Sequence, residues 1–121
     1  MERREIIPTP LFLSDYKQLK KKFPSIRNEI NNFEEFMQNP QNKLLGVPVP
    51  GLKNVNGNKV FKYRMPNKSA NKGRSGGFRL IYYYMTSGNT IFLLTIYSKT
   101  HLEDIPSHVI DQIIKKYFDK V

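Results

Sequence analysis

The sequence predicts an α+β fold, in which a small, mostly antiparallel sheet packs against an N-terminal helical hairpin and is followed by a C-terminal helix. Two stretches of apolar residues at helical spacing occupy the first third of the chain. Runs of aromatic and branched residues typical of strands follow, and a helical pattern returns near the end. The resulting order of strand, two helices, three strands and helix is typical of an α+β domain. At 121 residues, we expect one domain spanning residues 1–121.

The N-terminal segment predicts a short strand followed by two helices. Residues 3–7 are interpreted as an edge strand that ends at Pro8. Thr9 and Pro10 are typical of an N-cap followed by proline at the first helical position. The Pro24-Ser25 pair interrupts the chain before a second helix, which stops before Pro40. The apolar stripes of both helices are assigned to the core: Phe12, Tyr16, Leu19 and Phe23 in the first, and Ile26, Ile30, Phe33 and Met37 in the second.

The second half of the chain predicts three strands and a helix. Residues 41–58 are rich in Pro, Gly and Asn and are interpreted as a connector. Strands are predicted at residues 59–65, 78–85 and 90–97, and the short turn TSGN joins the last two in an antiparallel hairpin. This hairpin places Arg79 opposite Ile96 or Tyr97. Ser107 is expected to cap a final helix, whose apolar stripe is Ile110, Ile113, Ile114 and Tyr117.

The net charge of +10 is concentrated in the middle of the chain. Residues 1–35 and 103–121 together carry ten basic and ten acidic residues, whereas residues 36–102 carry ten basic and no acidic ones. This middle segment is expected to meet a polyanion, and nucleic acid is favoured over a solvated basic face. The chain has no cysteine, and its longest apolar stretch is too short to cross a bilayer. We therefore expect a soluble cytoplasmic protein with no membrane partner.

Antiparallel pairing is expected to bring basic side chains from separate segments to one end of the sheet. If residues 59–65 pair with residues 78–85, Lys62 and Arg64 share one face of their strand, because side chains alternate along it. No carboxylate or cysteine is expected beside this cluster to hold a metal. Its predicted members are Lys62, Arg64, Arg74, Arg79, Lys99 and His101, with Lys72 in the glycine-containing loop beside them.

Such a cluster is suited to cleaving RNA without a metal or another cofactor. RNA supplies its own nucleophile, the 2′-OH, so the protein must provide a base, an acid and cations that stabilise the charge growing on the phosphate. Arg74 and Arg79 are assigned to phosphate contact, although pairing with a carboxylate or a carbonyl is the alternative for Arg79. The glycines Gly73, Gly76 and Gly77 match no phosphate-binding P-loop and predict a turn with close approach of the backbone.

Four segments of the sequence resemble, in order and spacing, the RelE/HigB family of toxins from bacterial toxin–antitoxin pairs: VPGL, VFKYRMP, GRSGGFRLIYYY and IFLLTIYSKTHLEDI. The resemblance implies an endoribonuclease that enters the ribosomal A site, cuts mRNA there without a metal, and is silenced by a cognate antitoxin. By position, Lys62 and Arg64 match a basic pair on the strand before the loop. Arg79 matches the arginine that grips the scissile phosphate, and Lys99 matches the lysine after the final strand.

Two positions depart from the family pattern and leave other functions open. Where RelE has an arginine and a tyrosine implicated in the chemistry, this sequence has Thr100 and, near the second position, Pro106. His101 is therefore our hypothesis for the general acid. One alternative is a ParE-like toxin, which shares the fold, lacks the basic set and acts on DNA gyrase without catalysis. The other is an RNA-binding module without chemistry, whose RNA affinity would depend strongly on salt.

Overall fold

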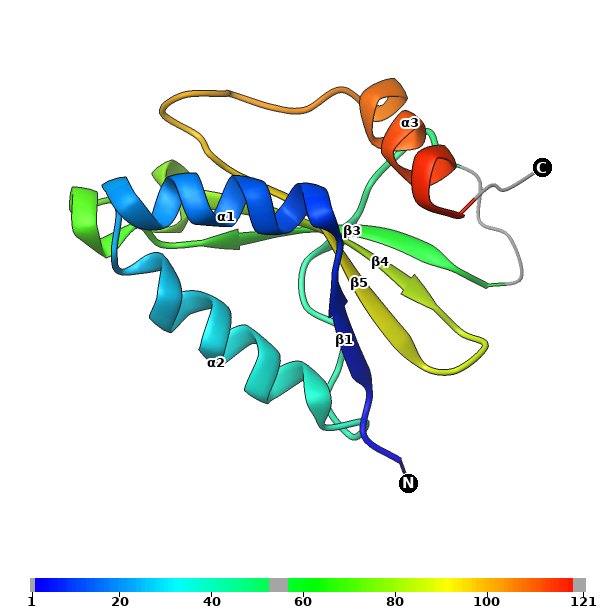
Figure 1. Ribbon diagram of the computed structural model, residues 1–121. Coiled ribbons are helices and arrows are strands. Elements are labelled where there is room, and N and C mark those ends of the chain that lie inside the picture. Colours follow the sequence, from blue (N-terminus) through cyan, green and yellow to red (C-terminus); the bar gives the residue numbers. More distant parts are fainter. Residues whose placement is uncertain (1, 53–56, 119–121) are drawn as a thin grey trace.

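The computed structural model describes residues 2–52 and 57–118, and within them a five-stranded sheet is accompanied by three α-helices (Figure 1). The predicted α+β fold is confirmed. The helices are α1 (Pro10–Lys22), α2 (Ile26–Gln38) and α3 (Ser107–Phe118). The strands are β1 (Glu5–Pro8), β2 (Val47–Pro48), β3 (Lys59–Met65), β4 (Phe78–Met85) and β5 (Thr90–Ser98), and two short 3₁₀ turns, η1 (Lys68–Ala70) and η2 (Arg74–Gly76), lie between β3 and β4.

The strand order across the sheet is β1-β5-β4-β3-β2. β1 pairs with β5 in parallel, and the other neighbours are antiparallel. The predicted connector contains β2, which pairs with β3 through only two residues and therefore carries no strand pattern of its own; residues 53–56 of that connector lie outside the described residues. The hairpin register places Arg79 opposite Tyr97, one of the two predicted partners.

The sheet separates two apolar clusters. On one face, buried residues of α1 and α2 pack against side chains such as Phe78, Leu80 and Tyr82 of β4. On the other face, Ile110 of α3 packs against a smaller cluster that includes Ile81. Figure 1 shows α2 and α3 on opposite sides of the sheet. Since α3 covers only part of the second face, the rest of that face is left for polar side chains.

The two predicted helix caps have different outcomes. Thr9 caps α1 as expected, with its Oγ1 accepting a hydrogen bond from the Phe12 N–H at 3.2 Å. The expectation for Ser107 is wrong: this residue is the first of α3, and its hydroxyl donates to the Pro50 carbonyl at 2.9 Å. The carbonyl of Pro106 instead accepts the first hydrogen bonds of the helix. The hydrogen bond from Ser107 to Pro50 ties the start of α3 to the segment that follows β2.

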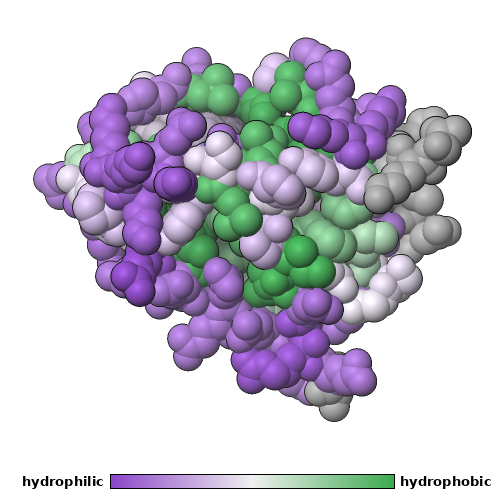
Figure 2. All heavy atoms as spheres, viewed as in Figure 1, coloured by the Kyte–Doolittle hydropathy of each residue, from purple (hydrophilic) through white to green (hydrophobic). Residues whose placement is uncertain are grey.

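The surface seen in the view of Figure 1 has hydrophilic side chains around its edge and apolar ones toward its middle (Figure 2). In the described part of the chain, no helix is long and apolar enough to span a bilayer.

Candidate functional site

Four basic residues from three separate segments line one open pocket of about 460 Å³. Lys62 and Arg64 come from β3, Arg79 from β4, and Lys99 follows the end of β5. The segment from β5 to α3, which arches over this end of the molecule in Figure 1, contributes Glu103 and Asp104 to the same pocket. We call this site the basic pocket. The structure thus brings together four of the seven basic residues that the sequence assigned to one site.

The pairing of β3 with β4 explains why these cations meet. Arg64 lies directly opposite Arg79, and Lys62 lies two residues away on the same face of β3. Like charges directly opposite each other on neighbouring strands are destabilising. Arg64 is exposed, and neither it nor Lys99 has an ion pair or a side-chain hydrogen bond within residues 2–52 and 57–118. An anion bound between these side chains would relieve their mutual repulsion.

Arg79 has a second, structural task, which is the alternative that the sequence left open for it: it pairs with backbone carbonyls. Its side chain is buried, with the residue only 3% exposed. One terminal nitrogen donates to the Arg74 carbonyl at 2.8 Å and to the Phe78 carbonyl at 3.3 Å, and the other donates to the Ser75 carbonyl at 2.8 Å. Burial and the neighbouring Arg64 lower the pKa of Arg79. Arginine carries five N–H donors, so two remain for a ligand in the basic pocket.

The loop that Arg79 holds depends on one glycine. A Cβ at Gly77 would lie 2.1 Å from the Met65 carbonyl oxygen and 2.8 Å from the Asn67 amide nitrogen. The Gly77 carbonyl in turn accepts the Lys99 N–H at 2.9 Å. The predicted close approach of the backbone is therefore found at Gly77, whereas an added Cβ at Gly73 would meet no atom within 4 Å.

The expectation that no carboxylate lies beside the cluster is wrong. Asp104 Oδ1 lies 3.1 Å from Lys62 Nζ, and the Tyr97 hydroxyl donates to the same oxygen at 3.1 Å. Partial burial alone would raise the pKa of Asp104, but hydrogen bonds from Lys62 and Tyr97 hold that pKa below its ordinary value. Burial, together with the bond to Asp104, raises the pKa of Tyr97 to about 12. No group of three or more His, Cys, Asp or Glu that could hold a metal is found among the residues that the structure describes.

Lys72 and Arg74 lie beside the basic pocket without lining it. Lys72 borders a smaller hollow with Ser75 and Thr100, and this hollow shares Lys99 with the basic pocket. Arg74 borders a different hollow, next to side chains of α2 such as Phe33. Lys72 is thus adjacent to the basic pocket through Lys99, whereas the Arg74 side chain belongs to another part of the surface.

His101 also lies outside the basic pocket. Its Nε2 is 2.7 Å from Lys22 Nζ at the end of α1, its Nδ1 is 3.2 Å from Thr100 Oγ1, and its ring meets the Phe23 ring edge-on. A lysine ammonium donates and cannot accept, so Nε2 of His101 is the acceptor in this contact.

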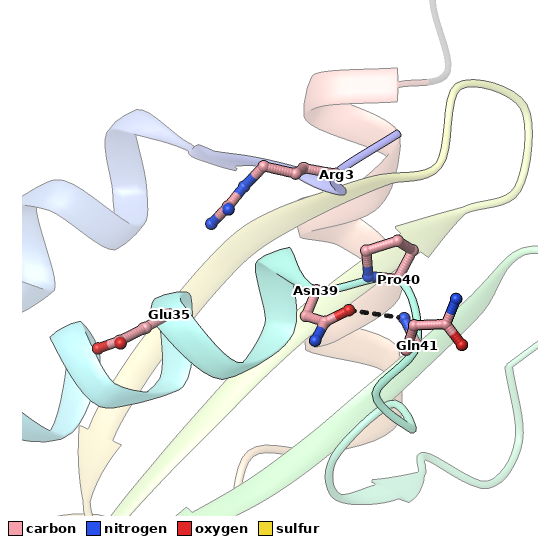
Figure 3. A pocket seen from close by; sticks show the side chains of 5 residues that line it. All are labelled: Arg3, Glu35, Asn39, Pro40 and Gln41. Atoms are coloured by element: carbon pink, nitrogen blue, oxygen red, sulfur yellow. Dashed lines mark hydrogen bonds between the residues drawn. The ribbon is translucent and has the colours of Figure 1, made fainter. Parts of the chain in front are cut away.

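A further hollow of about 480 Å³ lies near the N-terminus and the end of α2. Figure 3 shows Arg3 and Glu35 on its walls, and the Asn39 side-chain oxygen accepting the Gln41 backbone N–H at 2.9 Å. Pro40 completes the lining. The positive charge of Arg3 is balanced here by the negative charge of Glu35, and the other lining residues are neutral. This hollow therefore attracts a polyanion less than the basic pocket does.

The arrangement of three helices around a mixed five-stranded sheet is a RelE-like fold. A solved structure with this fold is that of a double arginine-to-alanine variant of E. coli toxin RelE in the free state, which is 15% identical to this chain. The match covers 98% of this chain and 100% of the RelE chain, with a TM-score of 0.56. No family model matches the sequence.

Proposed function

We propose that this protein is the toxin of a toxin–antitoxin pair and that it cuts mRNA on the ribosome as a metal-independent endoribonuclease. The fold shared with toxin RelE supports the toxin assignment. The observation that carries RNA cleavage is the meeting of Lys62, Arg64, Arg79 and Lys99 in one pocket. The proposed partners are a cognate antitoxin and mRNA in the ribosomal A site. We also propose that residues 1–121 form a single toxin domain that acts in the cytoplasm.

In the proposed reaction, the 2′-oxygen of the RNA attacks the adjacent phosphorus and the P–O5′ bond breaks. The 2′-hydroxyl proton leaves to a base, and O5′ takes a proton from an acid, which yields a 2′,3′-cyclic phosphate and a 5′-hydroxyl. Arg64 and Arg79 are assigned to the phosphate oxygens, because a guanidinium presents paired donors at the spacing of two oxygens. Lys62 and Lys99 add positive charge where negative charge develops.

His101 as the general acid stays a hypothesis. To reach the basic pocket, its ring would have to leave its contact with Lys22. If His101 donates the proton, the substitution His101→Ala will slow cleavage without weakening RNA binding. Equal rates for this variant and the wild type would assign the acid to another group, and Lys99 is one candidate because it lines the basic pocket.

Induced expression of the protein is expected to stop protein synthesis, with new mRNA 5′ ends inside codons that are being translated. The reason is that the ribosome would present the mRNA backbone to the basic pocket. Primer extension on transcripts before and after induction would measure both the position and the timing of the cuts. Equal cutting of ribosome-free transcripts would contradict the ribosome dependence. DNA-damage signalling without arrest of translation would instead support a toxin that acts on DNA gyrase.

A further inference from the structure

An acidic residue occupies the pocket that is proposed to receive RNA. Asp104 Oδ1 accepts from Lys62 Nζ at 3.1 Å, from the Tyr97 hydroxyl at 3.1 Å and from the Ile105 backbone N–H at 2.9 Å. Three donors thus fix one carboxylate oxygen. The Asp104 side chain is nevertheless 61% exposed, whereas that of Lys62 is 24% exposed. The carboxylate therefore sits at the open side of the pocket, where an incoming anion would arrive.

Asp104 offers Lys62 the same kind of ligand as an RNA phosphate does. Both groups present anionic oxygens to the ammonium, so both compete for its charge. A carboxylate in the pocket also repels a phosphate at close range. Its lowered pKa keeps Asp104 ionised at neutral pH. Neighbouring Glu103 lines the same pocket but has no ion pair within the described residues. Of these two acids, Asp104 is the one that is fixed on a cation.

We propose that Asp104 is a specificity-determining residue: an internal anion that occupies Lys62 and weakens the binding of free RNA, so that only RNA held by additional contacts displaces it. This inference rests on the proposed function, in which the ribosome supplies those contacts. The ion pair between Asp104 and Lys62 is partly exposed, and ion pairs of this kind contribute only modestly to the stability of the folded protein. A weak ion pair is what the proposal requires, because RNA on the ribosome must be able to displace Asp104 from Lys62. A strong ion pair would also exclude ribosome-bound RNA.

The substitution Asp104→Asn is expected to tighten binding of a short 2′-O-methyl RNA, which cannot be cleaved by 2′-OH attack, by about fivefold. Lys62 becomes available for one more phosphate contact, so the slope of log affinity against log salt should steepen by about 0.7. Fluorescence anisotropy at several salt concentrations measures both quantities. Asp104→Glu keeps the anion and should retain the affinity of the wild type.

Two matched variants remove the same charge without breaking the contact with Lys62. Asp111→Asn acts on α3, where Asp111 pairs with Lys115 at 3.0 Å, and Glu103→Gln acts within the basic pocket. Both are expected to tighten binding much less than Asp104→Asn. An equal gain in Glu103→Gln would overturn the proposal, because it would show a general effect of charge.

A double substitution isolates the pair itself. In a Lys62→Ala background, Asp104→Asn should lose its advantage over Glu103→Gln, since the cation that it releases is gone and both variants remove one carboxylate from the basic pocket. An advantage that persists in this background would overturn the role of Asp104 as a competitor for Lys62. Cleavage of ribosome-bound mRNA is measured in parallel. If the wild type cleaves but Asp104→Asn binds free RNA no more tightly, the inference fails and the proposed function stands. If the wild type does not cleave ribosome-bound mRNA, the proposed function is contradicted, whatever the binding measurements show.

Discussion

Replacing Arg64 with alanine is expected to lower the rate of RNA cleavage by about 100-fold or more, while the midpoint of thermal unfolding does not fall and can rise as the repulsion of Arg79 is removed. Arg64 is exposed and has no ion pair within the described residues, so its loss leaves no group of the protein without a partner. In the proposed reaction, its guanidinium stabilises the charge on the phosphate only while RNA is bound. Single-turnover cleavage of ribosome-bound mRNA measures the rate, and a thermal melt measures the stability.

Lys59→Ala is the matched control for this prediction. Lys59 lies on the same strand and is exposed, but it does not line the basic pocket. Its loss removes the same charge and should change the rate only a few-fold. Cleavage that survives in Arg64→Ala, or an equal loss in Lys59→Ala, would remove Arg64 from the site.

Arg79→Ala is expected to abolish cleavage as well, but it is a less direct test. This substitution removes the hydrogen bonds to the carbonyl oxygens of Arg74, Ser75 and Phe78, and the loss of buried or partly buried hydrogen bonds costs stability. The variant should therefore lose stability and activity together. Arg64→Ala separates the two effects, which is why it is the sharper experiment.

Gly77→Ala is expected to destabilise the protein by about 3 kcal/mol or more, because its new methyl group would overlap the backbone. The Met65 carbonyl oxygen would lie 2.1 Å from that methyl group and the Gly73 carbonyl oxygen 2.9 Å from it. Backbone atoms cannot turn away as a flexible side chain can, so the loop must shift. Urea denaturation of the purified variant measures the free energy of unfolding.

Gly73→Ala is the companion variant in the same loop. An added methyl group there meets no atom within 4 Å, so the free energy of unfolding should change by less than about 0.5 kcal/mol. If Gly77→Ala proves as stable as Gly73→Ala, the close approach of the loop to the end of β3 is not required.

The sequence predicted the elements whose patterns are local and regular. Runs of aromatic and branched residues in β4 and β5, joined by a short turn, were enough to place Arg79 opposite Ile96 or Tyr97, and the second of these is its partner. The helical stripes of α1 and α2 predicted which side chains face the core, because a period of 3.6 residues puts them on one face, although Tyr16 and Leu19 are only partly buried there. The meeting of Lys62 and Arg64 with Arg79 followed from the expected antiparallel pairing of β3 with β4.

The parts of the site that the sequence missed lie on irregular backbone. Asp104 belongs to the segment between β5 and α3, which has no period, and its path depends on how α3 packs against the sheet. The acidic pair Glu103-Asp104 directly after the predicted cluster was the available signal. The loop around Arg74 is a second example. Tertiary contacts set its path, in which the Arg74 side chain lies near α2 and the Arg74 carbonyl faces Arg79.

The chemistry of the product ends tests the central claim most directly. Ribosome-bound mRNA is incubated with the purified protein, and the cut fragments are analysed by mass spectrometry. Attack by the 2′-oxygen under the influence of the basic pocket predicts fragments that end in a 2′,3′-cyclic phosphate and begin with a 5′-hydroxyl. Fragments that begin with a 5′-phosphate would contradict the account.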